Sequence, residues 1–108
     1  MLDTTELTAA VERFADRLRA APQSRLQRGA AAEALGLARE LALRAQLVEM
    51  PGRTPETMPD AGVFAVADQL MVAGNDLAEA LRTAPSRTGA DVDEAVGLVR
   101  GAAGRAGM

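Results

Sequence analysis

The strongest constraint on the fold is a run of apolar and small residues, spaced three or four positions apart, between Val63 and Leu81. An α-helix has 3.6 residues per turn, so this spacing puts the whole run on one helix face, whereas a strand would divide it between two faces. The run consists of Val63, Ala67, Leu70, Gly74, Leu77 and Leu81, with Phe64, Met71 and Ala78 on the same side. We therefore expect a core helix over residues 60–83, capped by Asp60.

Three further segments show the same helical period. Their apolar residues predict helices at about 4–20, 25–49 and 90–103. Pro22 separates the first two helices, because proline cannot continue a helix. Alanine and leucine are abundant and the chain has two Phe, no Trp and no Tyr, so the side chains that favour strands are scarce.

The connections between these helices predict one domain of 108 residues, an all-α, up-down-up-down four-helix bundle. Three prolines make residues 51–59 the one extended loop of the domain. Residues 104–108 follow a glycine-weakened helix, and we expect this tail to fray.

The residue types that are absent restrict the chemistry. The chain has no His and no Cys, and its sequence also contains no Lys and no Tyr. Without them it cannot form a Ser-His-Asp or Cys-His triad, a Schiff base, a Walker-type lysine or a His/Cys metal site. We therefore expect no enzymatic activity, no metal site and no cofactor.

Charge and composition indicate the setting of the protein. The net charge of −3 is unlike that of a general nucleic-acid or membrane-surface binder. There is no basic and apolar leader at the N-terminus, and no apolar run approaches the ~20 residues that a membrane span needs. We expect a cytoplasmic protein, and its exclusive use of arginine among basic residues is typical of coding in a GC-rich bacterial genome.

Acidic side chains are the remaining candidates for acid–base chemistry or for binding hard metal ions. They gather in two places, Asp91, Asp93 and Glu94 in one, and Asp68 and Glu79, with the amide of Asn75 between them, in the other. Acids at a helix start stabilise its dipole, and the second set lacks the paired E-x-x-E or E-x-x-H ligands of helical metal sites. We interpret both sets as solvated helix surface.

Basic side chains gather around the turn between the first two predicted helices. Arg17 and Arg19 suit the negative end of the first helix, but Arg25 and Arg28 lie at the positive start of the second. An acidic or phosphate group would relieve that repulsion. These four arginines are therefore the candidate anion site of a small-ligand or anion-binding bundle.

Residues 31–41, Ala-Ala-Glu-Ala-Leu-Gly-Leu-Ala-Arg-Glu-Leu, resemble the helix-turn-helix pattern in which alanine-rich turns precede Leu-Gly-Leu and a recognition helix. This resemblance implies a DNA-binding regulator whose duplex contacts are Arg39 and Arg44. The mixed charge around these arginines is the reason that we rank nucleic acid below a protein partner, and one uninterrupted helix also accounts for the same residues.

A second face of the predicted 25–49 helix is the candidate partner surface. Gly29, Gly36, Leu43 and Leu47 are separated by seven, seven and four residues, which is the repeat of a helix-packing seam. They lie away from the apolar stripe that faces the core. The leading prediction is therefore a non-enzymatic protein-interaction module, a small adaptor or regulatory protein that binds itself as a homodimer or binds another protein.

Overall fold

The computed structural model describes residues 2–108, and this part of the chain is helical without any strand. Four long helices pack together, which confirms the all-α four-helix bundle. They are α1 (Thr5–Ala20), α3 (Ala31–Glu49), α4 (Val66–Thr83) and α5 (Gly89–Arg105). The short α2 (Gln23–Arg25) and the π-helical turn η1 (Leu26–Ala30) connect α1 to α3.

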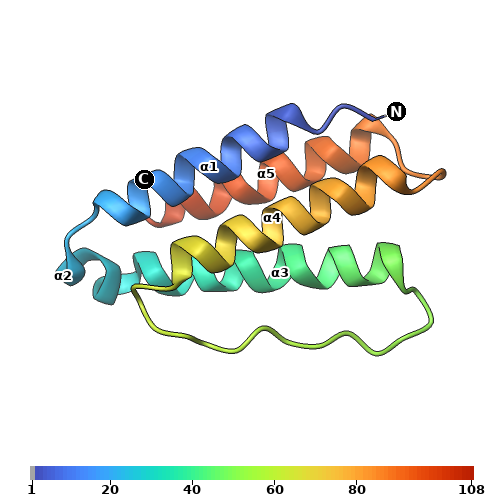
Figure 1. The fold of residues 1–108 in the computed structure, drawn as a ribbon. Helices are drawn as coiled ribbons and strands as arrows, with labels where there is room; N and C mark the ends of the chain where they lie inside the picture. Colours follow the sequence, from blue (N-terminus) through green and yellow to red (C-terminus); the bar gives the residue numbers. More distant parts are fainter. Residues whose placement is uncertain (1) are drawn as a thin grey trace.

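The order of helix directions differs from the predicted up-down-up-down arrangement. Figure 1 shows α1 and α5 running one way along the bundle and α3 and α4 running the other way. The connection of residues 50–65 therefore returns along the whole length of the bundle before α4 starts. An extended chain covers up to about 3.5 Å per residue, so a connection of this length spans a 19-residue helix without difficulty.

Side chains of α3 and α4 hold this long connection in place. The Gln46 amide binds both backbone groups of Glu56, donating to its carbonyl at 2.9 Å and accepting from its N–H at 2.8 Å. Arg39 Nε donates to the Met58 carbonyl at 2.8 Å, and Gln69 Nε2 donates to the Pro59 carbonyl at 2.8 Å. The predicted loop of residues 51–59 is thus an extended strap along α3.

The core lies where the four long helices meet. Its largest fully buried side chains are Phe14, Leu7, Leu18, Leu41, Leu70, Leu77, Val11 and Val99. Helix α4 approaches α1 closely at Gly74, because a Cβ there would lie 2.8 Å from both methyl carbons of Val11. A glycine is therefore required at this crossing.

The predicted start of the helix at residue 60 is wrong, because α4 begins at Val66. Asp60 Oδ1 instead accepts from the Gly62 N–H at 2.9 Å, and Gly62 has a φ of +94°, so this segment forms a turn. Phe64, predicted beside the core, lies on that turn and is 78% exposed.

The predicted helix of residues 25–49 is also divided. Gly29 has a φ of +147°, which breaks the helix before α3 begins at Ala31. Glycine tolerates this conformation because it has no Cβ.

The end of the chain is more ordered than the predicted fraying of residues 104–108. Helix α5 continues through Arg105, and the Met108 N–H donates to the Ala103 carbonyl at 2.8 Å. The start of α5 is held by a capping box in which the Asp91 carboxylate accepts from the Thr88 N–H at 2.8 Å.

Among the helices of residues 2–108, none combines the length and apolar character that crossing a membrane requires.

Candidate functional site

The outer face of α3, which we define as Ala32, Gly36, Leu43 and Leu47, contains three residues of the predicted partner surface. The helix buries its opposite face, with Ala34, Leu41 and the other core residues below 9% exposure, and the helical period then turns these four residues outward. Leu47 is 43% exposed and Leu43 is half-buried. Ala32 and Gly36 are exposed, and a Cβ at Gly36 would meet nothing within 4 Å.

Gly29, the first residue of the predicted seam, does not belong to this face. Its positive φ places it in the turn before α3, where the helical repeat does not apply. The structure therefore keeps three of the four predicted seam residues together. Ala32, which was not among the predicted residues, also belongs to this face, because it lies one helical turn before Gly36.

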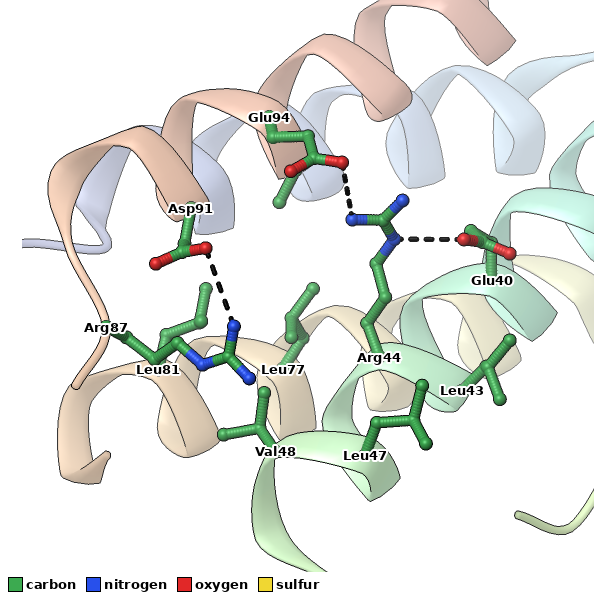
Figure 2. A pocket seen from close by; sticks show the side chains of 11 residues that line it. Glu40, Leu43, Arg44, Leu47, Val48, Leu77, Leu81, Arg87, Asp91 and Glu94 are labelled. Carbon is green, nitrogen blue, oxygen red and sulfur yellow. Dashed lines mark hydrogen bonds and ion pairs between the residues drawn. The ribbon is translucent and has the colours of Figure 1, made fainter. Parts of the chain in front are cut away.

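Leu43 and Leu47 border a groove between α3 and α5 (Figure 2). Its floor is apolar, because Leu77 and Leu81 of α4 lie beneath it, and its volume is about 260 Å³. Both floor leucines are buried, at 2% and 3% exposure. The groove exists because α3 and α5 are joined here by long charged side chains instead of by close packing.

The charged rim of this groove consists of two arginines and their acidic partners. Arg44 Nε donates to Glu40 at 2.9 Å and its Nη1 donates to Glu94 of α5 at 2.8 Å. Arg87 lies 3.6 Å from Asp91. Partial burial lowers the pKa of Arg44, but its hydrogen bonds with Glu94 and Glu40 outweigh this effect and the pKa is raised.

A second hollow lies at the other end of the outer face. It has a volume of about 420 Å³ between the start of α3 and the segment that precedes α4. Ala32 and Gly36 form part of its wall, together with Leu35, Val63 and Val66. Small residues on α3 leave this space open. The outer face thus carries a pair of leucines at one end and a hollow at the other.

The two predicted DNA contacts, Arg39 and Arg44, are partly buried and bind other parts of the chain. Arg39 binds the strap through Met58, and Arg44 joins α3 to α5 through Glu94. Helix α3 is continuous through Gly36, where the helix-turn-helix pattern requires a turn. The turn of that pattern is therefore replaced here by an uninterrupted bundle helix, and DNA binding stays an alternative prediction.

The four arginines of the predicted anion site do not converge on one empty site. Arg17 and Arg25 donate to the backbone carbonyls of Met108 and Gly107 at the end of the chain. Arg19 donates to Asp68 at 2.8 Å, and this hydrogen bond raises its pKa. Carbonyl oxygens at the negative end of α5 thus occupy the place that we assigned to an anion. Arg28 is exposed and makes no ion pair within residues 2–108.

The acidic residues that the sequence offered as candidate ligands also lie at separate places. Asp91 and Glu94 belong to the groove rim, whereas Asp68 and Glu79 form ion pairs with Arg19 and Arg82. In the described part of the chain, no three acidic side chains come close enough together to hold a metal ion.

The groove floor was absent from the sequence argument, because Leu77 and Leu81 carry the periodicity of ordinary core residues. Only the packing of α4 under the gap between α3 and α5 makes them part of a surface feature. Val72 of α4, 57% exposed, is a further apolar side chain that no sequence pattern singled out.

No protein family, no curated protein and no solved structure matches this chain.

Proposed function

We propose that this protein is a non-enzymatic interaction module, a small adaptor or regulatory protein, that assembles as a homodimer through the outer face of α3. The observation that carries the proposal is the exposure of Leu47, at 43%, beside the half-buried Leu43 on the same helix face. Glycine inside a helix costs about 1 kcal/mol relative to alanine. At Gly74 the contact with Val11 accounts for the glycine, whereas Gly36 of α3 and Gly97 of α5 have no such contact within residues 2–108.

The surroundings of the outer face support the same proposal. On one side of α3, Gln46 is hydrogen-bonded to the strap, and on the other side Arg44 is hydrogen-bonded to Glu94 of α5. Between these two sides, Leu43 and Leu47 remain in contact with solvent. A second copy of the chain would remove this apolar surface from water, at roughly 25 cal/mol per Å² buried.

The test is light scattering on a size-exclusion column, comparing wild type with Leu43→Glu/Leu47→Glu. We expect wild type to elute with twice the mass of one chain and the variant with the mass of one chain, because burying two carboxylates at an interface is unfavourable. Circular dichroism of the variant should keep the helical signal, since neither leucine is fully buried.

The matched control is Val72→Glu, which makes the same type of change at an exposed apolar residue on α4. It should leave the mass of the dimer unchanged. Dissociation by Val72→Glu to the same extent, or a double variant that still has twice the mass of one chain, would remove the outer face of α3 from the proposal.

A second candidate function is the binding of a small apolar molecule in the groove of Figure 2, favoured by its floor of buried leucines. Its volume of about 260 Å³ lies just below the range of about 300–1,000 Å³ usual for ligand pockets. The dye 1-anilinonaphthalene-8-sulfonate serves as the probe. Fluorescence that Leu81→Glu abolishes but Val72→Glu does not would support this function, and no fluorescence with wild type would contradict it.

A further inference from the structure

A third hollow lies between α1 and α5, which run side by side in Figure 1, and it shares no residue with the outer face of α3 or with the groove. Its volume is about 240 Å³. Phe14 and Val99, each 1% exposed, form its apolar floor. The space above them is open because Ala103 is short and because Gly104, where an added Cβ would meet nothing within 4 Å, has no side chain. We call this feature the α1–α5 hollow.

The lining of the α1–α5 hollow carries charge of one sign. Its charged residues are Arg13, Arg17 and Arg100, and no acidic residue lines it. The groove of Figure 2 has three acidic and two basic residues in its lining, and the hollow at the start of α3 has one of each. Of these three sites, the α1–α5 hollow is therefore the one whose charge complements an anion.

The three arginines differ in how far other groups of the chain already bind them. Arg100 Nη2 donates to Glu6 at 3.0 Å, and Arg17 donates to the Met108 carbonyl. The side chain of Arg13 forms no hydrogen bond and no ion pair within residues 2–108. All the donors of the Arg13 guanidinium are therefore available to a ligand at the rim.

The acidic neighbours of Arg13 on α1 do not take the place of an anion. Glu12 immediately precedes it, so the two side chains leave the helix in directions about 100° apart. Asp16 lies 3.4 Å from Arg19, with which it forms an ion pair. Neither acid lines the hollow. Within residues 2–108, Glu6 is therefore the one carboxylate paired with the three arginines of the hollow.

We propose that the α1–α5 hollow binds a small organic anion, a carboxylate that carries a short apolar chain. The chain would cover Phe14 and Val99, which removes apolar surface from water, and the carboxylate would accept hydrogen bonds from Arg13 and Arg100 at the rim. The volume equals that of about eight water molecules in the liquid, which limits the chain to a short one. This site does not depend on the proposed homodimer.

The test is a two-dimensional NMR titration of the uniformly ¹⁵N-labelled chain with octanoate. We expect saturable shifts of the Ala103 and Gly104 amide signals, with a dissociation constant of about 1 mM or lower. Octanol and octylamine have the same apolar chain without the carboxylate, and each should bind at least about tenfold more weakly. Acetate, which lacks the apolar chain, should cause no saturable shift in the same range.

Two variants test the two parts of the site. Arg13→Gln removes the rim charge and should raise the dissociation constant of octanoate by roughly threefold to tenfold. Ala103→Leu fills the space above the floor and should abolish binding. The matched control is Arg28→Gln, which removes an exposed arginine without an ion pair from outside the hollow and should leave the dissociation constant unchanged. If Ala103→Leu loses its helical circular dichroism, Arg13→Gln, at an exposed position, still decides the test.

The outcomes separate this site from the functions proposed above. No saturable shift with octanoate at roughly ten times the expected dissociation constant would overturn the proposal. Equally tight binding of octanol, or equal effects of Arg13→Gln and Arg28→Gln, would overturn the role of the arginines. Shifts confined to Leu77 and Leu81 would place octanoate in the groove of Figure 2, which would overturn the α1–α5 hollow and support the second candidate function.

Discussion

Helices α4 and α3 each carry a glycine in the helix interior, but the surroundings of the two glycines differ. Gly74 of α4 lies against Val11, and a Cβ there would be 2.8 Å from two methyl carbons. Gly36 of α3 faces open space, with nothing within 4 Å of an added Cβ. The first glycine lets two helices of one chain approach closely. The second has no such role within residues 2–108, and the proposal that a second copy covers its face rests on the exposed Leu47.

The two helix pairs around these glycines differ in the same way. The α1–α4 interface is closed by apolar contact, with Val11 at 1% exposure. The α3–α5 interface is bridged at one end by Arg44–Glu94, at the rim of the groove, and at the other end by Arg105–Glu33. Apolar burial supplies more stability than exposed ion pairs. We therefore expect substitutions at the first interface to reduce stability and those at the second to affect association more than folding.

The largest expected effect is that of Gly74→Val. The added methyl groups would overlap Val11, and we expect a loss of about 2–3 kcal/mol in the free energy of unfolding. Gly36→Val is the matched control and should change it by less than about 0.5 kcal/mol, since its space is open. Urea denaturation at a concentration below dimer formation measures both. Equal losses would contradict the distinction between the two glycines.

A smaller effect is expected at the side of α3 that holds the strap. Gln46→Leu removes the two bonds to Glu56, and we expect a loss of about 1 kcal/mol together with faster amide exchange at Glu56. Gln23→Leu, at an exposed glutamine of α2, is the control. If exchange at Glu56 stays as slow as in wild type, the amide of Gln46 does not hold the strap.

On the other side of α3, Arg44→Met should cost less than about 1 kcal/mol. Its side chain is 33% exposed and that of Glu94 is 59% exposed, so solvent screens their ion pair, while methionine keeps the apolar stem. Thermal melts at low and high salt measure this effect, and the difference from wild type should shrink as salt is added. A loss of several kcal/mol that salt does not change would mean that the α3–α5 bridge is a main support of the fold.

The smallest effect concerns Asp3, beside the start of α1. Hydrogen bonds from Thr5, first from its side chain and then from its backbone N–H, lower the pKa of Asp3. A carboxyl with a lowered folded pKa stabilises the fold above its unfolded pKa of about 3.9 and loses this contribution as the pH falls through the folded value. Wild type should therefore melt slightly above Asp3→Asn at pH 7 and equally at pH 2. A difference that persists at pH 2 would contradict this origin.

The sequence was sufficient to predict the class of fold because the 3.6-residue period is a local property. The helix predicted at 4–20 lies within one residue of α1, and the groups of core residues in α1, α4 and α5 follow their apolar patterns. Helix starts were less accurate. At Gly29 and Gly62, positive φ values produce turns that apolar spacing does not reveal.

Helix direction could not be predicted because it depends on where the strap lies. A connection as long as residues 50–65 can join antiparallel or parallel neighbours equally well, and the decisive contacts, such as Gln46 with Glu56, are specific to the folded state. The candidate surface was predicted in part. Its leucines followed from the helical repeat, but the groove floor and the Arg44–Glu94 bridge join elements far apart in sequence.

The most direct test of the self-association that this account proposes is sedimentation equilibrium of the unmodified chain, from below micromolar to several hundred micromolar concentration. A homodimer predicts an average mass that rises from that of one chain to that of two chains and then stays constant, because a twofold interface closes on itself. The mass of a single chain at every concentration would contradict the account, since the outer face of α3 would then be stable in water without a second copy.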